Sequence, residues 1–396
     1  GTSMDEAVTR GAKVQRLKVC ASSLATDHWI RAVAFRARRC AGVLAASLML
    51  SACGDGPGDA ELRVPAVDQV AARTAAATIR GADVLQRIAV MADDSMRGRP
   101  TPSPELDQVA NWIAGEFRRW GLQPLDHAET SAARPPSAES SGAQSSGARP
   151  SPTQPSGAQP SAAPAAGFVR RYRIPADADS AGVSAPNVVG VVEGSDPELR
   201  GEYVVFSAHI DHVGVGAPDA FGDSIYNGAD DDASGVAVMM EVAEAFASLD
   251  PRPRRSALFV MVSGEEEGLW GSNAIVADPH IDLDALVANF NADMVGRNWP
   301  DTIVAIGREH SELGTLLESV QRRLPELGMT AIDDRWPDEQ FFFRSDHYTF
   351  ARHGIPALFF FNGVHDDYHR PSDEVDRIDA DKAARIGRLI FHLGLE

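Results

Sequence analysis

The strongest constraint on the fold is a regular alternation of strand-like and helix-like apolar patterns after residue 186. Several of the strand-like runs are apolar without alternation, which is typical of strands covered on both faces of a sheet. Helical patterns, with apolar residues three and four positions apart, separate these runs. The order predicts a three-layer α/β domain in which helices flank a mixed, mostly parallel β-sheet. The expected strands are residues 187–192, 203–208, 257–262, 286–291, 302–306 and 357–361, and the expected helices are residues 235–249, 311–327, 346–353 and 381–393.

An earlier segment, residues 84–125, also has helical periodicity but is too short to form a domain alone. Between this segment and the expected sheet, residues 129–167 are dominated by Ser, Ala, Pro, Gly and Gln. Such a segment has too few large apolar side chains to offset the entropy of ordering it. We therefore predict a single domain over residues 84–396, interrupted by a disordered surface insertion at residues 129–167.

The first fifty residues have the pattern of a processing signal. A basic region containing Arg36, Arg38 and Arg39 precedes an apolar run at residues 41–50, which is too short to span a bilayer. Leu-Ser-Ala-Cys follows at residues 50–53 and resembles the cleavage site of a bacterial lipoprotein. The pattern predicts a leader over residues 1–53 and a flexible stalk over residues 54–83. It also predicts an exported protein in the bacterial envelope or periplasm, anchored through a lipid at Cys53.

Charge and cysteine content exclude several functions. The net charge of −19 argues against nucleic acid as a partner and against direct binding to an anionic membrane surface. We therefore expect contact with a membrane only through the lipid anchor. Cys20, Cys40 and Cys53 are the three cysteines, and all precede the expected domain. The domain therefore has no disulfide and no cysteine zinc ligand, so a metal there must be bound by His and carboxylates.

Five polar segments in the expected domain contain acids or histidines, and most of them lie at the ends of expected strands. They are residues 207–211, 228–235, 263–269, 291–294 and 368–373. In the first segment, the period of two along a strand places His209 and Asp211 on one face. A carboxylate in that position can fix the tautomer of a metal-bound imidazole. In the second, three consecutive acids at residues 230–232 are unfavourable near a core unless a cation offsets them.

Each segment alone also has an interpretation without chemistry. Acids at residues 230–232 could cap a helix N-terminus, and the glutamates at residues 265–267 could be a solvated charge run. Together, however, carboxylates and histidines at the ends of successive strands form an oxygen and nitrogen donor set that suits zinc. Ligands of α/β sheets gather at the carboxyl ends of the strands, so the sequence predicts a zinc site at that edge.

At this point the sequence resembles the co-catalytic zinc aminopeptidases, a family that also contains glutamate carboxypeptidase, glutaminyl cyclase and the transferrin-receptor ectodomain. The resemblance rests on Gly-Ala-Asp-Asp-Asp-Ala-Ser-Gly at residues 228–235 and Glu-Glu-x-Gly-Leu-x-Gly-Ser at residues 265–272. Ser-Asp-His at residues 345–347 and Gly-Ile-Pro at residues 354–356 also fit. The resemblance implies a zinc-peptidase/phosphorylase-like fold and two Zn²⁺ ions per chain. It also implies hydrolysis of N-terminal residues from peptides with a free N-terminus.

The resemblance further implies the roles of individual residues. The metal ligands would be His209, Asp231, Glu266, Asp293 and His369, with Asp231 bridging both ions. His209 and Asp293 would complete one zinc site, and Glu266 and His369 the other.

Three further residues have expected roles in the reaction. The resemblance implies that Glu265 is the general base on the attacking water and that Asp211 orients His209. Tyr368 lies next to a ligand and is a candidate donor to the tetrahedral oxyanion. The resemblance also implies a cis peptide bond between residues 231 and 232.

The remaining histidines are interpreted as structural, because a histidine near a motif is more often a satisfied core or surface residue than a ligand. Near the motifs these are His212, His347, His353 and His365, and elsewhere they include His280, His310 and His392.

Three alternatives to an aminopeptidase follow from the same resemblance. A glutaminyl cyclase shares the fold but uses one zinc, with a serine where Asp232 follows the bridging acid here. A carboxypeptidase for acidic C-terminal residues needs a cationic pocket, for which Arg344 and Arg370 are candidates. A non-catalytic binding ectodomain usually lacks the metal ligands, whereas all five are present here.

Overall fold

The computed structural model describes residues 68–125, 167–175 and 182–396, which lie in the second of two units of the chain, residues 60–396. The predicted leader, the anchor at Cys53 and residues 129–166 of the predicted insertion lie outside the described residues and stay predictions. Among the described helices, none is both long and apolar enough to cross a bilayer.

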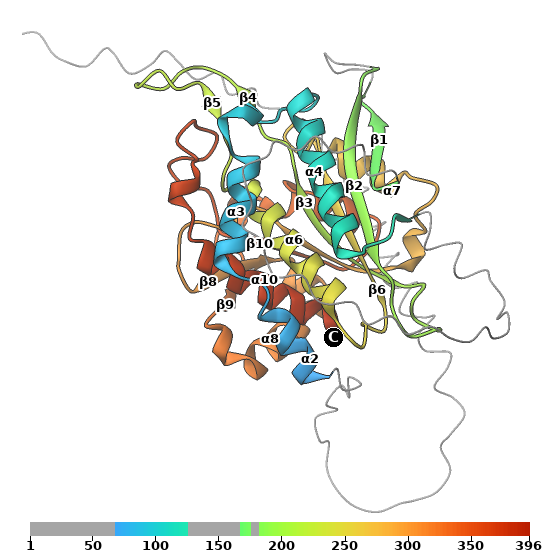
Figure 1. Ribbon diagram of the computed structural model, residues 1–396. Coiled ribbons are helices and arrows are strands. Elements are labelled where there is room, and N and C mark those ends of the chain that lie inside the picture. Colours follow the sequence, from blue (N-terminus) through green and yellow to red (C-terminus); the bar gives the residue numbers. More distant parts are fainter. Residues whose placement is uncertain (1–67, 126–166, 176–181) are drawn as a thin grey trace, which may run out of the picture. The chain divides into compact units, whose positions relative to one another are not determined.

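A sheet of eight strands forms the centre of the described unit (Figure 1). In spatial order the strands are β1 (Val169–Arg173), β2 (Ser184–Val192), β6 (Ser256–Val262), β3 (Tyr203–His209), β7 (Leu286–Ala292), β10 (Ala357–Phe361), β8 (Thr302–Ile306) and β9 (Thr330–Ile332). The four central strands β6, β3, β7 and β10 are parallel, as are β8 and β9. The pairs β1–β2, β2–β6 and β10–β8 are antiparallel. The predicted mixed, mostly parallel sheet is therefore confirmed.

Helices cover both faces of this sheet (Figure 1). They are α2 (Gln69–Ala76), α3 (Gly81–Met91), α4 (Pro104–Trp120), α6 (Ala233–Ser248), α7 (Trp270–Val276), α8 (Leu313–Arg323), α9 (His347–Ala351) and α10 (Ala380–Leu395). Short 3₁₀ turns lie at Asp94–Met96, Leu283–Ala285, Arg308–His310, Pro325–Leu327, Pro337–Glu339, Phe341–Phe343 and Val375–Arg377. A small hairpin of β4 (Gly214–Val215) and β5 (Ile225–Tyr226) follows β3.

The alternation of side chains along β6 shows how the three layers are built. Phe259 and Met261 belong to the core cluster that contains α6, whereas Leu258 and Val260 belong to a second cluster with Ile275 of α7. Successive residues of a strand point to opposite faces, so a strand buried on both faces needs apolar residues at every position. All seven residues of β6 are buried, which explains its uninterrupted apolar sequence.

Helix α6 lies against the central strands and packs on α3 and α10. Its sequence is apolar nearly all round, as expected for a helix enclosed on all sides. The helix begins at Ala233 because the carboxylate of Asp232 accepts a hydrogen bond from the amide of Gly235 at 3.0 Å. The start of α6 is thereby fixed at the carboxyl edge of the sheet.

The predicted stalk at residues 54–83 is wrong for its described part, residues 68–83. Asp68 caps α2, and the side chains of Ala72 and Ile79 are 0% exposed in the main core. The pattern was missed because α2 buries small alanines, which carry little of the periodic signal of large apolar residues. The sequence patterns also did not predict β1, β9, α7 or the separate α2 and α3.

Truncating Ile79 tests whether this N-terminal segment is part of the fold. We expect Ile79→Ala to lower the free energy of unfolding by about 2–5 kcal/mol, because a fully buried side chain leaves a cavity. Val70→Ala is the matched control, since Val70 lies in α2 but is 76% exposed, and it should change stability by less than about 0.5 kcal/mol. Urea unfolding of both variants measures the difference. Equal stability of the two variants would show that residues 68–79 are a dispensable extension.

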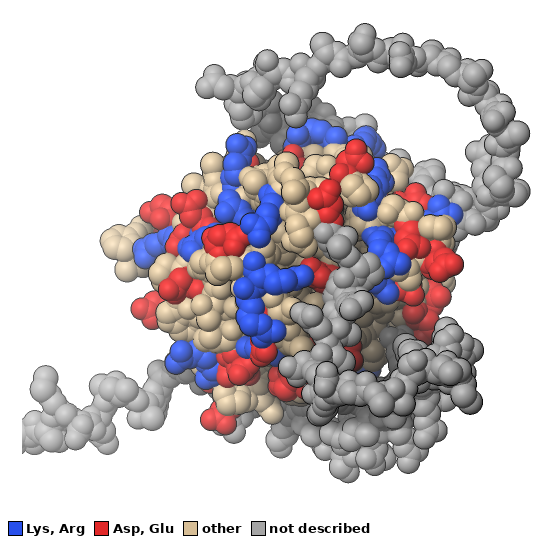
Figure 2. Space-filling view, turned by 90° about the horizontal axis from the view of Figure 1, so that it is seen from below, with Lys and Arg blue, Asp and Glu red and all other residues tan. Residues whose placement is uncertain are grey.

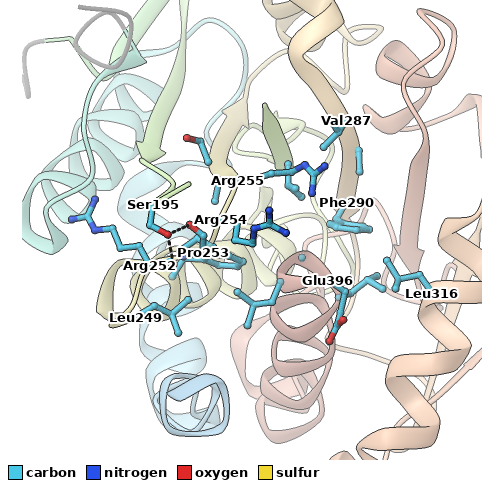
Figure 3. Close-up of a pocket in the computed structure, with 18 of the residues that line it drawn as sticks. Ser195, Leu249, Arg252, Pro253, Arg254, Arg255, Val287, Phe290, Leu316 and Glu396 are labelled. Carbon is cyan, nitrogen blue, oxygen red and sulfur yellow. Dashed lines mark hydrogen bonds between the residues drawn. The ribbon is translucent and has the colours of Figure 1, made fainter. Parts of the chain in front are cut away.

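A cavity of about 520 Å³ opens where β3, β6 and β7 begin (Figure 3). Phe290 and other apolar side chains line it together with Arg254 and Arg255. Arg254 donates to Asp196 at 2.9 Å and Arg255 to Glu202 at 2.6 Å, so both charges are compensated. Acidic and basic side chains are likewise interspersed on the face seen in Figure 2. The cavity lies at the amino ends of β3, β6 and β7, whereas the predicted zinc site lies at their carboxyl ends.

Candidate metal centre

The parallel strands bring the predicted zinc ligands together at the carboxyl edge of the sheet. His209 is the last residue of β3, and Asp293 directly follows β7. Glu266 lies in the turn after β6, and His369 lies in the segment between β10 and α10. Asp231 lies just before α6. Because β6, β3, β7 and β10 are parallel neighbours, their carboxyl ends meet at one edge.

The first group of donors consists of His209, Asp231 and Asp293. The Nε2 atom of His209 lies 3.3 Å from Oδ1 of Asp231 and 3.6 Å from Oδ1 of Asp293. The hydroxyl of Ser345 donates to the other oxygen of Asp293 at 2.8 Å, which orients that carboxylate. These are three of the five predicted ligands, in the predicted grouping.

The second group consists of His212, Asp231, Glu266 and His369. The Nε2 atom of His369 lies 3.0 Å from Oδ2 of Asp231 and 3.1 Å from Oε2 of Glu266. The Nδ1 atom of His212 lies 2.8 Å from Oε1 of Glu266. His212, which the sequence analysis interpreted as structural, is fully buried and lies within this group. It is the one member of the two groups that the sequence did not predict.

Asp231 belongs to both groups and presents one carboxylate oxygen to each. Oδ1 faces His209, and Oδ2 faces His369. The imidazoles of His212, His209 and His369 outweigh the effect of burial and hold the pKa of Asp231 well below its usual value. The peptide bond between Asp231 and Asp232 is cis, as the sequence predicted.

The two other acids of the triplet, Asp230 and Asp232, accept hydrogen bonds from backbone amides. Asp232 accepts from the amides of His209 and Met294, each at 3.1 Å, in addition to capping α6. Asp230 accepts from the amide of Gly296 at 2.6 Å. The interpretation as a helix cap is therefore correct for Asp232, whereas Asp231 alone of the three faces the donor groups.

The site carries more buried negative charge than its imidazoles compensate. Burial by itself lowers the pKa of His209, yet the carboxylates of Glu265 and Asp293 raise it well above its usual value. Burial raises the pKa of Glu265 well above its usual value, and Glu266 and Asp293 add to the effect. A divalent cation between these groups would compensate the carboxylate charge that contributes to both shifts.

The donor atoms fit a bound zinc ion. Nε2 of His212 is buried without a hydrogen-bond partner among the described residues. Nδ1 of His212, Oε1 of Glu266 and Nε2 of His369 are also buried, and their close approaches to one another and to Asp231 do not have hydrogen-bond geometry. Buried polar atoms are normally satisfied, so such a cluster of unsatisfied donors and acceptors indicates a missing ligand. Imidazoles and carboxylates are ligands that zinc prefers, and no cysteine is needed.

Asp211 lies beside His209, but its carboxylate is not the closest acceptor of that ring. The Nδ1 atom of His209 lies 3.2 Å from the carbonyl oxygen of Asp211 and 3.7 Å from its Oδ1. The amide of Glu265 donates to the same Oδ1 at 3.3 Å. Asp211 therefore orients His209 through its main chain, while its carboxylate holds the turn that carries Glu265.

Tyr368 stacks on His369, with the ring centroids 3.9 Å apart. Burial, reinforced by Asp231 and Glu266, raises the pKa of its phenol, so the hydroxyl stays protonated and able to donate. Its placement next to a predicted ligand agrees with the sequence, and its role as an oxyanion donor stays a prediction. Arg344, suggested for a cationic pocket, lies near Glu339 at 3.8 Å and is not in either donor group.

An α/β sheet with two linked groups of His and carboxylate donors at its carboxyl edge is an arrangement suited to binding metal ions. Residues 187–394 match Peptidase family M28, which is just over half of the chain. The chain therefore belongs to Peptidase family M28, and metallopeptidase with zinc is the class that this membership and the donor set support.

Individual relatives are more distant. A probable zinc metalloprotease of Leptosphaeria maculans is 34% identical over 119 residues, which cover 30% of this chain and 26% of that protein. Aminopeptidase YwaD of Bacillus subtilis is 25% identical over 217 residues, which cover 52% of this chain and 43% of that protein. The chain thus spans about a quarter to less than half the length of these two relatives.

Solved structures share the fold over most of the chain. The LapA aminopeptidase of Legionella pneumophila has a TM-score of 0.59 at 18% identity, covering 91% of this chain and 82% of that one. The glutaminyl cyclase of Porphyromonas gingivalis has a TM-score of 0.55 at 16% identity, covering 79% and 96%. At these identities the likeness concerns the fold alone.

Replacing His212 tests its place in the second donor group. We expect His212→Ala to weaken the retention of one zinc ion by about 10–100-fold, because the ring contacts Glu266 and faces Asp231. His280→Ala is the control, since His280 is exposed and pairs with Asp278 away from the site. Competition with a chelator measures zinc affinity for both variants. Equal affinity would return His212 to a purely structural role.

Proposed function

We propose that the protein is a zinc-dependent exopeptidase that removes N-terminal residues from peptides with two zinc ions per chain. The observation that carries this proposal is the position of Asp231, whose two oxygens face two separate donor groups. His209 and Asp293 would hold one ion with Asp231, and Glu266 and His369 the other, with His212 beside them. When bound, a pair of zinc ions polarises the peptide carbonyl and lowers the pKa of an attacking water to about 7.

The residues around the ions divide the remaining work. Glu265 is the general base in this proposal, because it adjoins Glu266 and belongs to neither donor group. As a carboxylate beside the metal-holding residues, it would take the proton of the attacking water and pass it to the leaving amine. Tyr368, which stays protonated, would donate to the oxyanion.

One named relative favours the N-terminus of a peptide as the substrate over its C-terminus. Among the relatives, the Bacillus subtilis protein is named an aminopeptidase. The two complete donor groups also favour a two-zinc peptidase over a one-zinc cyclase or a non-catalytic module.

Substrate selection tests the proposal directly. We expect the zinc-loaded enzyme to cleave aminoacyl-anilides, to leave N-blocked peptides intact and to lose activity on treatment with a chelator. Initial rates on both substrate types, with C-terminally acidic peptides and N-terminal glutaminyl peptides alongside, distinguish the alternatives. Preference for the acidic peptides would identify a carboxypeptidase, and cyclisation without cleavage would identify a cyclase.

The two adjacent glutamates test the mechanism. Glu265→Gln keeps the shape of the side chain but cannot accept a proton, so turnover should fall by about 10²–10⁴ with both zinc ions retained. Glu266→Gln removes a charged ligand, so one zinc should bind more weakly, and added zinc should restore part of the activity. Metal content by mass spectrometry and rates on a leucyl-anilide measure both effects.

The outcome of this pair is informative in either direction. Loss of zinc from Glu265→Gln, with two ions retained by Glu266→Gln, would exchange the two roles. Full activity and full metal content in both variants would remove the glutamates from the mechanism.

A further inference from the structure

A segment far from the metal ligands in sequence lies directly beneath the site. Residues 97–102 connect the first 3₁₀ turn to α4 and lie outside the residues that match the family. Arg99 is 0% exposed and Thr101 is 8% exposed, although both are polar. Neither residue belongs to a donor group, yet both contact the loops that carry the donors.

The guanidinium of Arg99 holds the main chain of these loops. It donates to the carbonyl of Ile210 at 3.0 Å, just after β3, and to those of Gly228 at 2.8 Å and Asp231 at 3.3 Å. It also donates to the carbonyls of Asn227 and Met91. One side chain therefore ties the loop after β3 to the loop that presents Asp231. Thr101, two residues further along, contacts the loop after β3 and the loop after β6.

The hydroxyl of Thr101 makes two hydrogen bonds to two parts of the site, one as donor and one as acceptor. It donates to Oδ2 of Asp211 at 3.0 Å and accepts from the amide of Gly264 at 3.0 Å. The other oxygen of Asp211 accepts from the amide of Glu265 at 3.3 Å. Thr101, Asp211 and the backbone of residues 264–265 thus form a closed hydrogen-bonded ring. One member of this ring is the main-chain amide of Glu265, the proposed general base.

We propose that Thr101 is a positioning residue that sets the placement of Glu265 through Asp211 and Gly264. This inference rests on the proposed function of Glu265. Without the hydroxyl, the amide of Gly264 and one oxygen of Asp211 lose their partners inside a buried site. The turn then has to move to satisfy them, and Glu265 moves with it. A catalytic group displaced by about 1 Å can lose about 100-fold in rate.

Two substitutions of Thr101, by valine and by serine, distinguish a role in positioning Glu265 from a role in packing. Thr101→Val keeps the shape and removes both hydrogen bonds, whereas Thr101→Ser keeps the hydroxyl and removes a methyl group. Thr78→Val is the control, since the Thr78 hydroxyl also makes a hydrogen bond, to the carbonyl of Ala75 at 2.7 Å, but lies in the N-terminal helical segment. If the valine variant is not recovered folded, Thr101→Ala takes its place.

The measurements are kcat and KM on a leucyl-anilide, zinc content, and amide hydrogen exchange at Gly264, all on the zinc-loaded full chain. We expect Thr101→Val to lower kcat by about 10–100-fold with an unchanged KM and full zinc content. Exchange at Gly264 should become faster, because its amide has lost its acceptor. Thr101→Ser should recover most of kcat, and Thr78→Val should match the wild type.

Several results would overturn the inference. A folded, zinc-loaded Thr101→Val with wild-type kcat would show that the hydroxyl does not place Glu265. Loss of zinc in proportion to activity would assign Thr101 to metal retention, and a serine variant as impaired as valine would show that keeping the hydroxyl does not keep Glu265 in place. These results all require an active wild type and leave the proposed function standing. A zinc-loaded wild type that cleaves no peptide substrate would remove the function and the inference together.

Discussion

The arrangement of the site depends on holding several carboxylates close together in a place from which water is largely excluded. Such a cluster is unfavourable unless each charge is compensated. The protein compensates them in two ways. Asp230 and Asp232 accept backbone amides, and Asp230 also lies 3.2 Å from the ring of His365. Asp231 and Glu266 face the imidazoles of the donor groups, where they could share a cation. The division of labour within one acidic triplet follows from which partners each carboxylate reaches.

Parallel strands supply the frame, but the loops must also approach one another closely. At Gly228, φ is +58°, and a Cβ atom would lie 2.5 Å from the ring of His212 and 2.2 Å from the carbonyl of Asp231. At Gly235, a Cβ atom would lie 2.4 Å from the carbonyl of Ala292 at the end of β7. The glycines of the Gly-Ala-Asp-Asp-Asp-Ala-Ser-Gly segment are therefore as necessary as its acids, because any side chain there would push the donor loops apart.

Local sequence patterns predicted six of the eight strands of the sheet, and the family resemblance implied the five ligands, which the structure brings together. A strand such as β6, buried on both faces, is apolar from its second residue to its last, and the polar residues that follow it must lie at the sheet edge. Elements with weak local patterns were missed. β1 contains three arginines among its five residues, and α2 buries alanines, so neither shows the periodicity of large apolar side chains. Tertiary packing, which the local pattern does not contain, decides both.

The contacts that surround the ligands were beyond sequence reasoning for a different reason. The alternation along β3 ends with the strand at His209, so it gives no direction for His212, which the turn brings round to Glu266. Thr101 and its partner Asp211 are 110 positions apart, and a threonine before a proline has no local feature that indicates a buried hydrogen bond. Donors can be recognised as a set because zinc restricts their chemistry to a few residue types. The residues that hold the donors in position are restricted only by geometry. Almost any polar side chain at the right point could make the necessary hydrogen bond, so only the folded structure identifies the residue that makes it.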